Sequence, residues 1–68
     1  RGNRKEALAI LERAFKRQQD AEIAAHLGEV LWSLGQRERA LAIWREGLRI
    51  NQDNSTLKDT LKRLGAQP

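Results

Sequence analysis

The side chains whose types and spacing could do chemistry are Glu22, His26 and Glu29, which follow one another at i, i+4 and i+7. On a helix this spacing places two carboxylates and an imidazole on one face, where they could bind a metal ion or relay a proton. Three groups on one helix do not close a coordination shell. His26 is the only histidine, and the chain has no cysteine. We therefore expect no metal site, no cofactor and no catalytic residues, and predict that the protein is not an enzyme.

The elements that position these groups form an all-α pattern. Apolar residues return every three or four positions, and no stretch alternates with the period of two that a strand needs. The pattern predicts four helices, over about residues 3–17, 21–34, 37–50 and 55–64. Such short helices leave no room for a substrate cavity of ordinary size. Residues 66–68 are expected to fray.

Capping residues mark the predicted helix starts. Asn3 followed by Glu6 is typical of a capping box, and Asp20 is expected to cap the second helix. Ser55 or Thr56 is expected to open the fourth helix.

Two features of the predicted helices bear on packing. Gly28 lies inside the second helix, where glycine costs about 1 kcal/mol relative to alanine. Its presence predicts a close approach of two backbones that a methyl group would block. The first helix gathers its apolar residues at helical spacing opposite a charged face that would be solvated, namely Ala7, Ile10, Leu11, Ala14 and Phe15.

The charge alternates along the chain. The net charge is +4, made up of +4 over residues 1–17, −3 over 18–34, +2 over 35–50 and +1 over 51–68. A basic surface on the first and third helices raises nucleic acid as a partner, but nucleic-acid sites need patches of a single sign. Nucleic acid is therefore the less favoured partner. No apolar run approaches the roughly 18–20 residues of a membrane span.

Self-comparison reveals an internal repeat. The pattern Gly-x4-Ala-Leu-Ala-Ile begins at Gly2 and recurs at Gly35, with every residue offset by 33. The first and third predicted helices are therefore copies of one unit, and the second helix and the start of the fourth are copies of the other.

On these residues the chain resembles the tetratricopeptide repeat (TPR) family. Counted from Ala21, the small and large signature positions of the family fall on Ala24, Leu27, Gly28, Leu31, Ala40, Trp44 and Gly47, and the turn glycine on Gly35. Three features depart from the family pattern. Gln52 replaces the usual proline, Ala24 replaces an aromatic or leucine, and the linker after the first helix is one residue short.

The resemblance implies a TPR-type α-solenoid at the C-terminal end of a repeat array. Residues 1–20 would form the second helix of a truncated repeat, 21–54 a complete repeat, and 55–68 a capping helix and tail. The first helix would then lack its partner and expose an apolar strip for self-association or for a longer array, made of Leu8, Leu11 and Phe15.

In the family, the first helix of each repeat lines a groove that binds peptides or proteins. Carried onto this chain, the groove residues are Glu22, Ala25, Glu29, Trp32, Ser33, Thr56, Asp59 and Arg63. Trp32 would either anchor a ligand or pack on the fourth helix. Glu22 and Glu29 have the wrong sign for the clamp by which some family members hold a C-terminal carboxylate. They favour a basic or polar segment instead.

The resemblance thus implies a protein–protein interaction module, a scaffold or adaptor whose partner is another protein or a peptide. It would bind through the groove of the second and fourth helices or through the strip on the first. The alternatives are a nucleic-acid-binding helical domain and a structural cap that self-associates as a homo-oligomer. The arrangement is also similar to the final repeat of long bacterial TPR scaffolds, including outer-membrane lipoprotein adaptors. A bacterial cytoplasmic or periplasmic location is therefore expected, with the cell envelope favoured through a longer parent chain.

Overall fold

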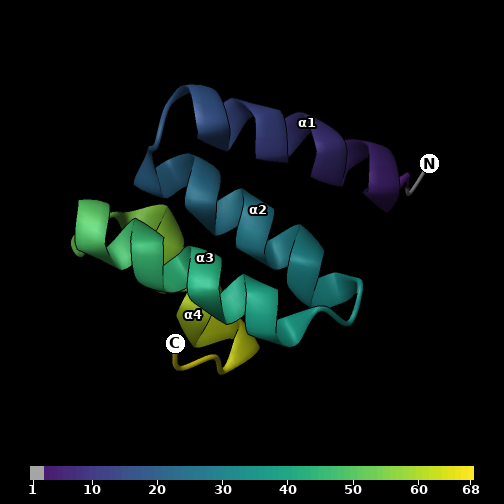
Figure 1. Cartoon of the computed structure of the whole chain (residues 1–68). Helices are drawn as coiled ribbons and strands as arrows, with labels where there is room; N and C mark the ends of the chain where they lie inside the picture. The colour runs from purple at the N-terminus through teal and green to yellow at the C-terminus, as the bar shows by residue number, and fades with distance from the viewer. Residues whose placement is uncertain (1–2) are drawn as a thin grey trace.

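The computed structural model describes residues 3–68, and they form four α-helices joined by short turns (Figure 1). Their bounds are α1 Arg4–Arg17, α2 Ala21–Ser33, α3 Arg37–Ile50 and α4 Ser55–Leu64. Each predicted helix is confirmed to within one residue, and residues 3–68 contain no strand. The all-α class is therefore confirmed. Gly2, where the first copy of the repeated pattern begins, lies outside the described residues.

The helix α2 occupies the centre of the fold. It lies between α1 and α3, which run in the opposite direction, and it also packs against α4 (Figure 1). The pairing of α2 with α3 is the most extensive in the molecule, and that of α3 with α4 is the least. Side chains of α2 that point in different directions therefore belong to different surfaces.

The first two helices begin as their capping residues predict. The Asn3 side chain accepts the backbone N–H of Glu6 at 3.1 Å, and the Glu6 carboxylate accepts from the Asn3 amide group rather than from its backbone. The carboxylate of Asp20 accepts a backbone N–H in the first turn of α2 at 2.6 Å. These bonds satisfy amides that have no partner inside the helix.

The bounds of α4 match the prediction, but its capping residue and the residues that follow it do not. Asn54, rather than Ser55 or Thr56, caps the helix by accepting the N–H of Leu57 at 2.9 Å. All three residue types cap well, so composition alone could not choose among them. At the other end, the expected fraying is wrong at Ala66, which is only 8% exposed and donates its N–H to the Leu61 carbonyl at 2.9 Å.

The turn between α2 and α3 closes on Gly35, whose φ of +84° is a left-handed conformation suited to glycine. The N–H of Gln36 donates to the Leu31 carbonyl at 2.9 Å, and that of Gly35 donates to the Trp32 carbonyl at 3.0 Å. These two bonds define a Schellman motif. It reverses the chain within three residues and so brings α3 back along α2.

The core centres on Trp44 of α3, which is fully buried. A Cβ added to Gly28 would lie 2.1 Å from its Nε1, so the indole ring occupies the space that a side chain on Gly28 would fill. The same Nε1 donates to the Ala25 carbonyl at 3.4 Å. The close approach predicted at Gly28 therefore exists, but it joins a side chain to a backbone rather than two backbones. The buried apolar residues are Phe15, Ala21, Ala24, Ala25, Leu27, Leu31, Ala40, Trp44, Leu57 and Ala66.

The apolar face of α1 differs from the predicted strip. Phe15 is only 9% exposed, and Leu8 and Leu11 are half-buried against the core. Ile10, which the helical periodicity grouped with Phe15, is 54% exposed. Five residues separate Ile10 from Phe15, so the two side chains lie about 140° apart around the helix. The exposed apolar residue of α1 is therefore Ile10, on a different side from the predicted strip.

Candidate partner-binding surfaces

The first surface is the face shared by α2 and α4, which we call the acidic face: Glu22, Glu29, Ser33, Thr56, Asp59 and Arg63. Side chains link its two helices. Thr56 Oγ1 donates to Glu22 Oε2 at 3.0 Å, and the Arg63 guanidinium donates to Glu29 Oε2 at 3.1 Å. The structure thus brings four of the predicted groove residues together across two helices, namely Glu22, Glu29, Thr56 and Arg63.

The charge of the acidic face remains negative after these contacts. Arg63 neutralises Glu29, but the hydroxyl and amide donors that reach Glu22, from Thr56 and Asn54, are uncharged. His26 Nε2 lies 3.6 Å from Glu22 Oε2, and both side chains are about half exposed. Asp59 is exposed and forms no ion pair within residues 3–68. The six residues of the face therefore carry three carboxylates against one guanidinium, and Arg4 of α1 lies at its edge, in a pocket shared with Glu29 and Ser33.

Ala25 does not belong to this surface, although it was expected there. Its side chain is fully buried, and its carbonyl accepts the Trp44 indole N–H. Ala25 follows Glu22 by three residues, which turns it about 60° away from that carboxylate. This rotation around α2 places Ala25 in the interface between helices instead of on the open face, so Ala25 cannot line the groove.

Trp32 packs on α3, which neither sequence interpretation anticipated. Its ring centroid lies 5.4 Å from that of Trp44 at an interplanar angle of 39°, and the Arg37 guanidinium lies 4.2 Å above the ring. Tilted aromatic pairs and guanidinium–indole contacts of this kind are attractive. The sequence analysis missed Arg37. Arg37 follows Trp32 by five residues, and because the turn at Gly35 lies between them, this spacing could have suggested the contact. Trp32 stays half-buried, with its ring engaged by α3.

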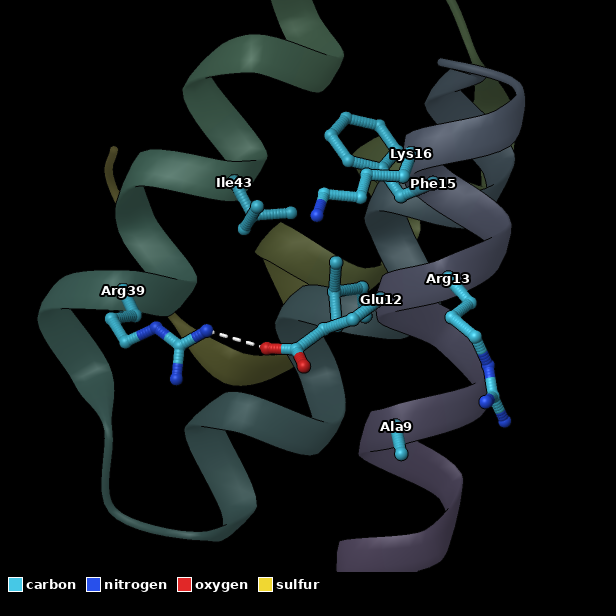
Figure 2. Close-up of a pocket in the computed structure, with 8 residues that line it drawn as sticks. Ala9, Glu12, Arg13, Phe15, Lys16, Arg39 and Ile43 are labelled. Carbon is cyan, nitrogen blue, oxygen red and sulfur yellow. Dashed lines mark hydrogen bonds and ion pairs between the residues drawn. The ribbon is translucent and has the colours of Figure 1, made fainter.

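The second surface is a groove between α1 and α3, with a volume of about 530 Å³. Figure 2 shows that the two helices form its walls, with Lys16 of α1 reaching toward Ile43 of α3. The Arg39 guanidinium of α3 binds the Glu12 carboxylate of α1 at 2.5 Å (Figure 2). The residues that line this α1–α3 groove are Ala9, Glu12, Arg13, Phe15, Lys16, Leu27, Arg39 and Ile43. The sequence did not reveal it, because helical periodicity does not report how far apart two non-consecutive helices lie.

The basic charge of α3 is partly compensated within the chain. Arg39 pairs with Glu12, and Arg49 pairs with Glu46 one helical turn away. The hydrogen bond from Arg49 lowers the pKa of the Glu46 carboxyl, and the same bond raises the pKa of Arg49. The guanidinium groups of these two arginines therefore face carboxylates of the protein itself, which weakens the case for a phosphate-binding surface.

The cluster of Glu22, His26 and Glu29 does not gather further ligands. Within residues 3–68 there is no group of three or more His, Cys, Asp or Glu side chains arranged to hold a metal ion. None of the helices in this part of the chain has both the length and the apolar composition of a membrane span. The Glu22 and Glu29 carboxylates instead accept hydrogen bonds from Thr56 and Arg63 of α4, which makes them part of the acidic face.

Of the comparisons with known proteins, only the one with protein families finds a match, and it agrees with the repeated helix pairs. Neither the curated proteins nor the solved structures contain a match to this chain. The sequence model of the tetratricopeptide repeat family matches residues 1–64, which is nearly the whole chain. Repeats of this family generally mediate protein–protein interaction and are typically not catalytic. Because the match extends over all four helices, the chain belongs to the tetratricopeptide repeat family.

Proposed function

We propose that this chain is a scaffold or adaptor module that holds a basic or polar peptide segment of a partner protein against the acidic face. The observation that carries the proposal is the pair of links between α2 and α4, through Glu22 with Thr56 and Glu29 with Arg63. These links hold side chains from two helices in one fixed surface before any ligand arrives. A preorganised surface loses less conformational entropy on binding than a mobile one.

The negative charge of the acidic face favours a positively charged ligand. Glu22 and Asp59 carry charges that no cation within residues 3–68 neutralises, apart from a protonated His26 beside Glu22. A lysine or arginine of a partner would satisfy these carboxylates, and their negative field would speed its association. The Ser33 and Thr56 hydroxyl groups donate their hydrogens to the Val30 carbonyl and to Glu22, and their oxygens can still accept from peptide N–H groups. An acidic peptide would be repelled.

The helix pairs support the division of the chain into repeat units. In this proposal α2 and α3 form one complete repeat, α1 is the second helix of the repeat before it, and α4 caps the array. The acidic face then joins the first helix of the complete repeat to the cap. The extensive α2–α3 pairing fits this division.

The test is the affinity of a labelled lysine-rich peptide, measured by fluorescence anisotropy. Glu22→Gln keeps an oxygen that can accept from Thr56 but removes the charge, so we expect the helices to stay linked and the affinity to fall about threefold or more. Glu22→Lys should weaken binding further.

Glu38→Lys is the matched control, because Glu38 is exposed on α3 and has no ion pair within residues 3–68. It makes the same change in net charge away from the acidic face. Equal losses for Glu22→Lys and Glu38→Lys would show that only overall charge matters and would refute the proposed face. Failure of the wild-type chain to bind the peptide would refute it as well.

A further inference from the structure

We propose that the α1–α3 groove is a second docking site, which receives an acidic amphipathic segment of a partner protein. The proposal does not depend on the acidic face, since the groove opens on another side of α2. Leu27, which contributes to the groove, lies about 140° around α2 from Glu22. The two surfaces can therefore be tested separately.

The lining of the groove calls for an apolar side chain. Ala9 of α1 and Ile43 of α3 supply accessible apolar surface, above a floor formed by the buried Phe15 and Leu27. Ile43 is half-buried and thus still offers area that a ligand can cover. The groove volume of about 530 Å³ lies within the range of sites that take small ligands or side chains. Covering this surface would favour binding through the hydrophobic effect.

The positive charge at the mouth of the groove favours a segment with acidic residues next to its apolar side chain. Lys16 is exposed, forms no ion pair within residues 3–68, and extends from α1 toward Ile43 across the groove (Figure 2). Glu12 is already neutralised by Arg39 at 2.5 Å. The remaining charge is therefore positive, and a carboxylate next to the inserted apolar side chain would meet the Lys16 ammonium group. An amphipathic helix presents such pairs at neighbouring positions.

Two other occupants fit the groove less well. Nucleic acid needs several free cations along a phosphate track, whereas half of the residues that line this groove are apolar and the Glu12 carboxylate on its wall already pairs with Arg39. A second copy of the chain would most readily insert Ile10, its exposed large apolar residue. Ile10 is flanked by Arg13, Lys16 and Arg17, so its insertion would bring cations against Lys16.

The experiment uses two synthetic helical peptides that differ only in charge. Both present leucine along one face, with glutamate flanking it in one peptide and lysine in the other. We expect the purified chain to bind the glutamate peptide, and Lys16→Glu to weaken that binding about tenfold, since it replaces an attraction by a repulsion. Ile43→Ala should weaken it about fivefold through lost apolar contact.

The matched control is Arg17→Glu, which makes the same charge change one residue further along α1 but outside the groove lining. It should alter the affinity by less than about threefold, and Glu22→Gln should leave it unchanged. Circular dichroism checks that each variant folds. Should Ile43→Ala unfold, the comparison of Lys16→Glu with Arg17→Glu decides alone.

Several results would overturn the docking site. The glutamate peptide could fail to bind, or Lys16→Glu and Arg17→Glu could weaken it equally. If duplex DNA bound more tightly than the glutamate peptide, and if Lys16→Glu abolished that binding, the occupant of the groove would be nucleic acid and not a peptide. Light scattering that shows a dimer of the wild-type chain and a monomer of Lys16→Glu would identify the occupant as a second copy.

Discussion

The two flanks of α2 are built in opposite ways. Toward α3, glycine at position 28 lets the Trp44 indole lie against the backbone, so closely that an added Cβ would fall 2.1 Å from Nε1. Toward α1, a groove of about 530 Å³ separates α1 from α3, and the Glu12–Arg39 ion pair links them. The first flank is filled by its own side chains, and the second retains open surface.

This difference suggests that the closely packed flank stabilises the fold and that the open groove is free to bind a partner. A closely packed interface gains from each contact and loses several kcal/mol when one large side chain is removed. An exposed ion pair contributes little, typically below about 1 kcal/mol. We therefore expect substitutions in the Gly28–Trp44 contact to change the free energy of unfolding strongly, and substitutions in the exposed Glu12–Arg39 pair to leave it nearly unchanged.

The largest effect is expected from Gly28→Leu. Its Cβ alone would overlap the Trp44 indole, and a domain of this length has roughly 3–10 kcal/mol of stability to lose. We expect the cooperative thermal transition followed by circular dichroism to disappear. Gly35→Ala is the control, because nothing lies within 4 Å of its Cβ; its left-handed backbone should cost only about 1–2 kcal/mol. Wild-type melting of Gly28→Leu would contradict the packing of Trp44 on α2.

Trp44→Ala should cost about 3–5 kcal/mol in urea unfolding, because it empties a fully buried site. The double variant Gly28→Leu with Trp44→Ala sharpens this prediction, since the leucine could occupy the space left by the indole. We expect the double variant to be more stable than the sum of the single effects requires. Strict additivity would mean that the two residues do not share one space.

Trp32→Ala should have a smaller effect, about 1–2 kcal/mol, because Trp32 is half-buried and loses its contacts with Trp44 and Arg37. The same urea titration measures it. Destabilisation equal to that of Trp44→Ala would show that Trp32 belongs to the core rather than to its edge.

The smallest effect is expected for the ion pair across the groove. A double-mutant cycle of Glu12→Gln and Arg39→Gln should give a coupling of about 0.2–1 kcal/mol that shrinks as salt is added. Both side chains are roughly half exposed, which allows solvent to screen them. A coupling above about 2 kcal/mol, independent of salt, would make this flank as tightly held as the other.

The sequence predicted the closely packed flank better than the open one. The helical periodicity, the capping residues and the repeat offset of 33 residues predicted the helices correctly. The signature positions Gly28 and Trp44 lie in contact, as expected of neighbours in one repeat. Side chains at the edges were harder to place. Ala25 and Ile10 each ended on a different side from the one expected, because a rotation of 60–140° around a helix separates groove from core. The α1–α3 groove depends on the spacing of two helices that share no sequence signal.

The indole pair gives the chain its own optical signal. Trp32 and Trp44 are its only tryptophans, and it has no tyrosine. Their rings lie close together and tilted, at 5.4 Å and 39°, one buried and one half-exposed. Chromophores so placed couple their electronic transitions, so the ultraviolet circular dichroism should contain an exciton couplet that exists only while α2 and α3 are docked. Emission from the same pair would follow the docking of these helices without any attached dye.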